Sequence, residues 1–368
     1  MSKNYEDYTP IYSGPPRRRT NSALTFVKLA IVFVLVFALA VSAIYFVYLH
    51  NNDDGGLPSD GIVETLPPGD ETGPEVKPPM GDDKPVQTEP PAETEDSQPT
   101  VKPEEKYTTV KLSAEEMQKG DLILVDSEHK VLYPEDDELV NLFASKTASY
   151  QISSMTMLIH KDIIEAFNKM MDDFVKETGN TDVIVWTSYR TKERQTEVYN
   201  QYVAQNGEES ASRYVAKPDE SDHNTGLGVA LRVFRGGLSY QFSEVEDEYG
   251  WIKDNCTKYG FTERYPADKI EKTGLDYTTS FYLRYVGAPQ AEIMKGNGFC
   301  LEEFLEFITE YEYGKNHFKY TSLDGVAYEL YYVKCEEGAE EIEVPVPEDC
   351  QYTVSGDNRG GFIVTVQK

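Results

Sequence analysis

The stretch SDHNTGLGVAL, residues 221–231, decides the fold of this chain together with TSFYLRYVG, residues 279–287. The segment SYRTKERQ at 188–195 precedes both, and YGF at 259–261 and RYP at 264–266 lie between them. Each pattern is short and is weak evidence by itself. Their order and spacing are specific in combination, because chance would have to match several separated segments at once.

In this order the segments resemble those of the VanY-type zinc D-alanyl-D-alanine carboxypeptidases, and the resemblance covers most of residues 107–312. It implies an α+β fold in which helices pack against an antiparallel sheet and the site lies over the sheet. It also implies a substrate, the D-Ala-D-Ala end of peptidoglycan stem peptides or a similar peptide.

The chain departs from the family pattern at the residues that perform the chemistry. In the family the first segment runs Ser-x-His-x-x-Gly-x-x-x-Asp and the second begins Glu-x-x-His; both His and the Asp hold zinc, and the Glu is the general base. Here only His223 is retained, because Ala230 stands at the Asp position, Thr279 at the Glu position and Tyr282 at the second His position. A hydrolytic zinc centre needs three protein ligands and a base. We therefore expect a degenerate member with no intact catalytic residue, no bound metal and no cofactor.

Some residues of the resemblance could still recognise a ligand. Arg190 aligns with the family arginine that faces the scissile carbonyl, and it could pair bidentately with a peptide carboxylate or make a structural salt bridge. Gln195 and Ser221 also stand at family positions, although serine often simply caps a turn. His223 is expected to be a hydrogen-bonded core residue, and Phe281 and Tyr282 are expected to fill the vacated metal space. Asp276 is the best substitute carboxylate if the site has been rebuilt.

Three functions follow from these residues. The first is a catalytically inactive module that binds peptidoglycan stem peptide or an envelope protein. The alternative is an active D-alanyl-D-alanine carboxypeptidase of peptidoglycan metabolism, with zinc held by substituted ligands. The third is a structural or assembly role without a peptide ligand.

The N-terminal part predicts a single-pass plasma-membrane protein. Residues 29–49 are uncharged and apolar, which is long enough to cross a hydrocarbon core of roughly 30 Å. Arg17, Arg18, Arg19 and Lys28 precede this run, and positive residues favour the cytoplasmic side. We therefore expect a cytoplasmic tail at 1–22, a transmembrane helix at 23–50 and an extracellular C-terminal domain; a cleaved signal peptide is the alternative.

Residues 51–106 are expected to form a disordered linker, because they contain no Phe, Tyr or Trp and are rich in Pro and acidic residues. The net charge of −29 argues against nucleic-acid binding, which requires a basic surface. The remainder divides into a carboxypeptidase-like domain at 107–318 and a small antiparallel β extension at 319–368.

Apolar runs, hydrophobic periodicity and composition locate the main elements of the outer part. These patterns predict strands at 121–125 and 182–188, and helices at 161–177, 191–202, 245–259 and 301–312. In the extension they predict strands at 326–334, 341–346, 351–355 and 361–366. Three disulfide connectivities are possible for the cysteines, and Cys335 with Cys350 is the favoured pair; free thiols are the alternative for Cys256, Cys300, Cys335 and Cys350.

Overall fold

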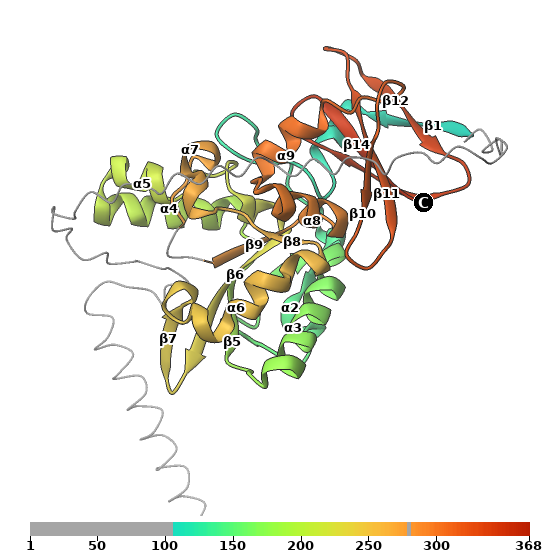
Figure 1. Ribbon diagram of the computed structural model, residues 1–368. Coiled ribbons are helices and arrows are strands. Elements are labelled where there is room, and N and C mark those ends of the chain that lie inside the picture. Colours follow the sequence, from blue (N-terminus) through green and yellow to red (C-terminus); the bar gives the residue numbers. More distant parts are fainter. Residues whose placement is uncertain (1–105, 278–280) are drawn as a thin grey trace, which may run out of the picture. The chain divides into compact units, whose positions relative to one another are not determined.

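The computed structural model describes residues 106–277 and 281–368 (Figure 1). The predicted cytoplasmic tail and transmembrane helix, the linker up to residue 105, and Thr279 lie outside the described residues. Within the part that is described, no helix is both long enough and apolar enough to cross a membrane.

The centre of the molecule is a six-stranded sheet, with strand order β3-β5-β6-β9-β8 and β7 paired to β6. All of its pairings are antiparallel except that of β3 with β5. The strands are β3 (Gln151–Ile152), β5 (Val183–Thr187), β6 (Gly228–Arg235), β7 (Leu238–Gln241), β8 (Phe261–Glu263) and β9 (Phe281–Tyr285). The α+β fold expected from the sequence is confirmed.

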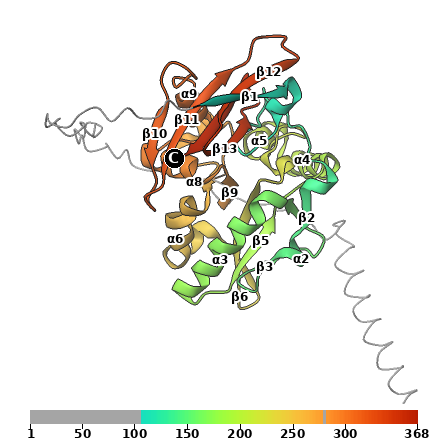
Figure 2. The same cartoon turned by 90° about the vertical axis from the view of Figure 1, so that its right-hand side faces the viewer.

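Two helices cover one face of this sheet. The predicted helix at 161–177 is found as α3 (Ile164–Thr178), and the helix predicted at 245–259 is α6 (Glu246–Asn255) followed by a 3-10 turn (Figure 2). The buried face of α3 carries Phe167, Met170, Met171 and Phe174, at the spacing of a helix. Burial of each of these side chains contributes about 1.5–3 kcal/mol to the stability of the fold. The helices therefore hold one face of the sheet, and the site lies on the other face.

A second sheet is formed by the C-terminal residues, in the order β10-β11-β14-β13. Its strands are β10 (Phe318–Thr321), β11 (Ala327–Lys334), β13 (Gln351–Gly356) and β14 (Gly361–Gln367). It packs on α8 (Ala288–Asn297) and α9 (Leu301–Ile308), where Leu330 and Ile363 share a hydrophobic cluster with Met294 and Leu305 (Figure 2). The remaining strand of this region, β12 (Glu341–Pro347), leaves the sheet and pairs with β1 (Tyr107–Ser113).

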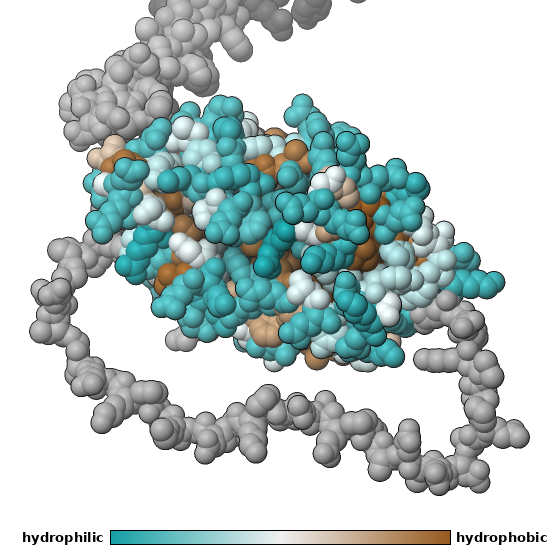
Figure 3. All heavy atoms as spheres, turned by 90° about the horizontal axis from the view of Figure 1, so that it is seen from above, coloured by the Kyte–Doolittle hydropathy of each residue, from teal (hydrophilic) through white to brown (hydrophobic). Residues whose placement is uncertain are grey.

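The other regular elements are short or peripheral. They are β2 (Leu139–Asn141), which pairs with β4 (Leu158–His160), and the helices α2 (Leu142–Ser145), α4 (Lys192–Asn206), α5 (Glu208–Tyr214) and α7 (Ile270–Thr273). On the face seen in Figure 3, hydrophilic side chains predominate and hydrophobic ones form small separate areas.

The prediction of a strand at residues 121–125 is wrong. Residues 122–125 are buried as their composition suggested, but they form an irregular loop. Its backbone is satisfied by scattered partners: the carbonyls of Asp121 and Ile123 accept from Arg284, and the amide of Leu124 donates to the carbonyl of Asp357. A short apolar run does not distinguish a strand from a buried loop whose hydrogen bonds come from scattered side chains and backbone groups.

The favoured disulfide between Cys335 and Cys350 is also wrong, and all four cysteines are free thiols. Cys335 follows the strand end where Lys334 pairs with Gly361, whereas Cys350 precedes the opposite end, where Gln351 pairs with Gln367. The length of β14 separates these ends by about 20 Å, at about 3.3 Å per residue. A disulfide requires Cα atoms within about 7 Å.

Candidate functional site

The antiparallel pairing of β6 with β9 brings the two motif segments together in the middle of the sheet (Figure 1). Ala230 lies directly opposite Tyr282 in this pairing. The turn before β6 is a short 3-10 helix, η4 (Asp222–Thr225), which carries His223 to the same place. Gly226 ends the turn with φ 72°, and a Cβ there would lie 3.2 Å from a backbone nitrogen of β4, so this position favours glycine.

His223 is a buried imidazole with one firm hydrogen bond. Its Nδ1 lies 2.8 Å from the carbonyl oxygen of Ser188, and its backbone nitrogen donates to the hydroxyl of Ser221 at 3.3 Å. Burial lowers the pKa of His223 well below its usual value; the positive charge of Arg190 lowers it further, and the Ser188 carbonyl only partly offsets both. The ring is therefore neutral at pH 7, with the proton on Nδ1 and Nε2 left as an acceptor.

Tyr282 fills the space beside His223. The two rings meet edge to face, with centroids 4.6 Å apart. The ring of Tyr265 stacks on that of Tyr277, and its centroid lies 6.0 Å from the centroid of the Tyr282 ring. The three tyrosines therefore form a cluster over Ala230. Burial raises the pKa of Tyr282 well above its usual value, which keeps the phenol neutral.

The hydroxyl of Tyr282 is buried and has no hydrogen-bond partner among the described residues. It rests against Gly228, where an added Cβ would lie 2.5 Å from the phenol oxygen and 2.7 Å from the carbonyl of Leu283. The absence of a side chain at residue 228 is therefore what admits the tyrosine ring.

Phe281 does not fill the vacated space, contrary to the prediction. It points to the opposite face of the sheet and stacks on Phe242, with ring centroids 4.3 Å apart. The reason is the alternation of side chains along a strand, which places adjacent residues on opposite faces. Tyr265 and Tyr277, and not Phe281, fill the space beside Tyr282.

Arg190 lies in the same cluster as His223. Its backbone nitrogen donates to the His223 carbonyl at 2.9 Å, and its guanidinium donates to Thr187 Oγ1 at 3.3 Å and to Gln195 Oε1 at 3.2 Å. Gln195 is itself fixed by a 2.6 Å hydrogen bond to the carbonyl of Ala216. The structure thus brings together the predicted recognition residues, while their role in binding stays a prediction.

Sequence comparison decides the family of this chain. The family model for VanY, D-alanyl-D-alanine carboxypeptidase, matches residues 156–288. A D-alanyl-D-alanine carboxypeptidase of Enterococcus faecium is 30% identical over 265 residues, which cover 69% of this chain and 78% of the relative. The chain belongs to the VanY family. Another D-alanyl-D-alanine carboxypeptidase, from Enterococcus faecalis (strain ATCC 700802 / V583), is 29% identical over 55% of this chain and 72% of its own length.

A solved structure supports the same assignment. The vancomycin-resistance D,D-dipeptidase VanXYg, in complex with a D-Ala-D-Ala phosphinate analog, superposes with a TM-score of 0.62 at 28% identity; the match covers 72% of this chain and 100% of that one. This VanY-family chain is therefore a D-Ala-D-Ala carboxypeptidase-like protein of peptidoglycan metabolism.

Zinc is the cofactor that the VanY family implies, and the described donors at this centre do not fit it. A catalytic zinc site takes three protein ligands from His, Cys, Asp or Glu and keeps one position for water. His223 is such a ligand, whereas Ala230 offers a methyl group and Tyr282 a neutral phenol. Over residues 106–277 and 281–368, no group of three His, Cys, Asp or Glu side chains could hold a metal ion.

The candidate substitutes have other partners. Asp276 pairs with Arg213, with 3.0 Å between Oδ2 and Nη2. The remaining described histidines each face a nearby carboxylate, and none is brought to His223: these are His129 with Asp126, His160 with Asp162 and His317 with Glu329.

A buried ion network directly behind the site was missed from the sequence. Asp222 lies on the 3-10 turn and accepts hydrogen bonds from Arg264 and Arg284. Arg264 also pairs with Glu302, with 2.8 Å between Nη2 and Oε1. Burial alone would lower the pKa of Arg264, but Glu302 and Asp222 raise it well above its usual value. The arginines of the RYP and RYVG segments were the available signal, because a buried arginine requires an acidic partner.

Proposed function

We propose that this VanY-family domain binds D-Ala-D-Ala-ended peptidoglycan stem peptides without hydrolysing them. The observation that carries the proposal is the pair of Ala230 and Tyr282, which stand opposite each other at the two ligand positions beside His223. With a methyl group and a buried phenol there, a zinc-bound water cannot be generated by the usual ligand set. The relative in complex with a D-Ala-D-Ala phosphinate analog supports the class of ligand.

Arg190 is the proposed anchor for the peptide carboxylate. A guanidinium can bind a carboxylate with two parallel hydrogen bonds, which gives both affinity and orientation. The hydrogen bonds to Thr187 and Gln195 orient the group in advance, so less side-chain entropy is lost when the ligand binds.

The proposal includes a location outside the cell, where this ligand occurs. It rests on the apolar run at residues 29–49, on the basic residues before it and on the acidic residues after it.

The binding test uses the purified full chain and a diacetylated L-Lys-D-Ala-D-Ala peptide. Calorimetry should detect binding, and the peptide should release no D-Ala with or without added zinc. Arg190→Gln should weaken binding at least tenfold, whereas Arg194→Gln, a matched change at an arginine paired with Glu197 on α4, should leave it unchanged. Zinc-dependent release of D-Ala would overturn the inactive assignment, and absence of binding would overturn the ligand.

A second experiment tests whether the residues at positions 230 and 282 alone prevent zinc binding. The double variant Ala230→Asp, Tyr282→His should bind zinc, because residues 230 and 282 face each other beside His223, whereas the natural chain should bind none. Metal content after dialysis is measured by mass spectrometry. One equivalent of zinc in the natural chain would show that other residues serve as ligands.

A further inference from the structure

A groove of about 770 Å³ lies between the C-terminal sheet and the start of α8. One wall is the face of β13 and β14 that carries Gln351, Thr353, Thr365 and Gln367; the register pairs Gln351 with Gln367 and Thr353 with Thr365. The other wall is formed by residues 286–290. This volume lies in the range of sites that take a drug-sized ligand or a disaccharide.

The lining of the groove is mixed, with somewhat more apolar than polar surface, and it carries no cation. Its polar groups are mostly side-chain amides and hydroxyls, and among the described residues that line it there is no Lys, Arg or His. The side chains of Gln351, Thr353 and Gln367 are exposed and make no hydrogen bond within the described part of the chain. Tyr328, which pairs with Gln367 on this face of the sheet, adds aromatic surface that suits the apolar face of a sugar ring.

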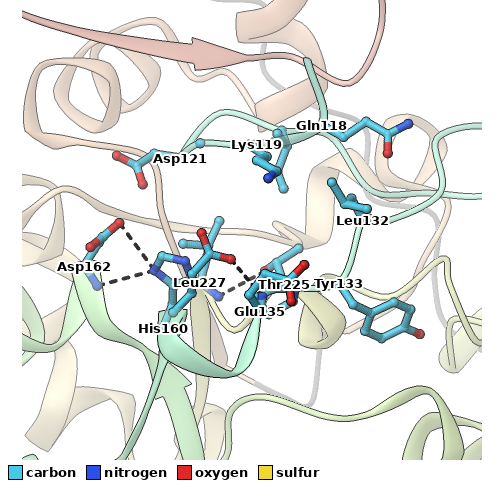
Figure 4. Close-up of a pocket in the computed structure, with 14 residues that line it drawn as sticks. Gln118, Lys119, Asp121, Leu132, Tyr133, Glu135, His160, Asp162, Thr225 and Leu227 are labelled. Carbon is cyan, nitrogen blue, oxygen red and sulfur yellow. Dashed lines mark hydrogen bonds and ion pairs between the residues drawn. The ribbon is translucent and has the colours of Figure 1, made fainter. Parts of the chain in front are cut away.

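Carboxylates lie at one end of the groove. Asp121 and Asp162 line both the groove and a smaller cavity of about 100 Å³. Figure 4 shows Asp121 facing Asp162 and His160 across that smaller cavity. Asp162 interacts with His160, whereas the carboxylate of Asp121 accepts no hydrogen bond from any described residue. It is therefore available to accept hydrogen bonds from the hydroxyl groups of a ligand.

This chemistry selects a neutral ligand rich in hydroxyl and amide groups. An anionic ligand would meet two carboxylates and no compensating cation, so a free peptide carboxylate or a phosphate is disfavoured. We propose that the groove binds the glycan strand of peptidoglycan through its N-acetylhexosamine units. The proposal extends the proposed function, because glycan and stem peptide belong to one polymer, but it concerns different residues and a different surface.

The competing occupant is an extended peptide. β13 is an edge strand of its sheet, and the edges of sheets can pair with an added strand. The groove side chains distinguish the two occupants, because a strand added at the edge would depend on the backbone of β13 more than on Gln351 or Gln367.

The test titrates the full chain with tri-N-acetylchitotriose, which carries no peptide, and follows binding by ligand-observed NMR. Thr353→Phe should fill the groove and weaken binding at least tenfold. Thr109→Phe, the same change at an exposed position of β1, should leave binding unchanged. Asp121→Asn, which keeps the size of the side chain, should weaken binding severalfold.

Two further titrations separate this proposal from the stem-peptide site. Arg190→Gln should still bind the sugar oligomer, and Thr353→Phe should still bind the diacetylated tripeptide. The glycan proposal is overturned if the natural chain does not bind the oligomer or if Thr353→Phe binds it equally well. If Thr353→Phe instead loses binding of an uncharged, sugar-free peptide and keeps binding of the sugar oligomer, the groove is assigned to a peptide.

Discussion

Replacing Asp222 by Asn tests whether the buried ion network supports the site. Asp222 faces two guanidiniums, and the side chains of Asp222, Arg264 and Arg284 are all within 1% of complete burial. In the variant Arg264 keeps Glu302, but Arg284 is left with the backbone carbonyls of residues 121, 123 and 285, at 3.0, 3.2 and 3.1 Å. The change therefore leaves one positive charge buried without a hydrogen-bonded carboxylate.

The expected cost follows from that uncompensated charge. Breaking a buried ion pair by removing one partner typically costs about 3–5 kcal/mol. The free energy of unfolding of a domain is about 5–15 kcal/mol, so Asp222→Asn should remove about a fifth or more of the stability. For a domain of this size the melting temperature should fall by about 6–20 °C, at about 2–4 °C per kcal/mol.

The measurement is urea unfolding of the natural chain and Asp222→Asn, followed by the fluorescence of the tryptophans. Glu197→Gln is the control, because its ion pair with Arg194 lies at the surface and should contribute less than about 1 kcal/mol. Adding Arg284→Met to Asp222→Asn removes the stranded charge, so the two changes should couple by at least about 2 kcal/mol. A cost below about 1 kcal/mol, or strict additivity with Arg284→Met, would refute this account of the network.

Three further variants test single contacts by unfolding measurements. Tyr282→Phe should stabilise the protein by about 1 kcal/mol, because its hydroxyl is buried without a partner among the described residues; destabilisation would show that the hydroxyl is hydrogen-bonded. Burial lowers the pKa of His223 in the folded state below its value in the unfolded chain, so the natural protein should lose stability as the pH falls and His223→Asn should not. Between pH 6.5 and 5 the natural protein should lose up to about 2 kcal/mol relative to the variant. Parallel profiles of stability against pH would contradict this. Burial raises the pKa of Asp121 to about 6, although Arg284 opposes the shift, so its ionised form destabilises the fold at neutral pH. Asp121→Asn should therefore be more stable than the natural protein by about 1–3 kcal/mol above pH 6, and this difference should disappear as the pH falls to about 4; a difference that persists at pH 4 would reject ionisation as its cause.

The sequence predicted the elements whose periodicity reports a single buried face. Helix α3 was predicted because Phe167, Met170, Met171 and Phe174 repeat at helical spacing, and Gly179 then ends the helix with φ 73°. It did not predict that residues 121–125 form a loop, because burial and apolar composition are common to strands and packed loops.

The contacts of the site were harder to predict because they join distant residues. Asp222 pairs with Arg264 and Arg284, which are 42 and 62 residues away, and no local pattern encodes that meeting. The replacement of the family ligands was visible directly, since Ala230 and Tyr282 occupy named positions of a motif. The neighbours that fill the space, Tyr265 and Tyr277, required the three-dimensional path of the chain.

The pairing of β1 with β12 has a mechanical consequence. β1 is the first strand after the predicted tether, and it is held by seven residue pairs to β12, from Tyr107 with Pro347 to Ser113 with Glu341. If the N-terminus is anchored and the domain grips the wall, a stretching force would reach this two-stranded ladder before the core. The ladder is then expected to unfold first under load, while the half that carries the proposed ligand site stays folded.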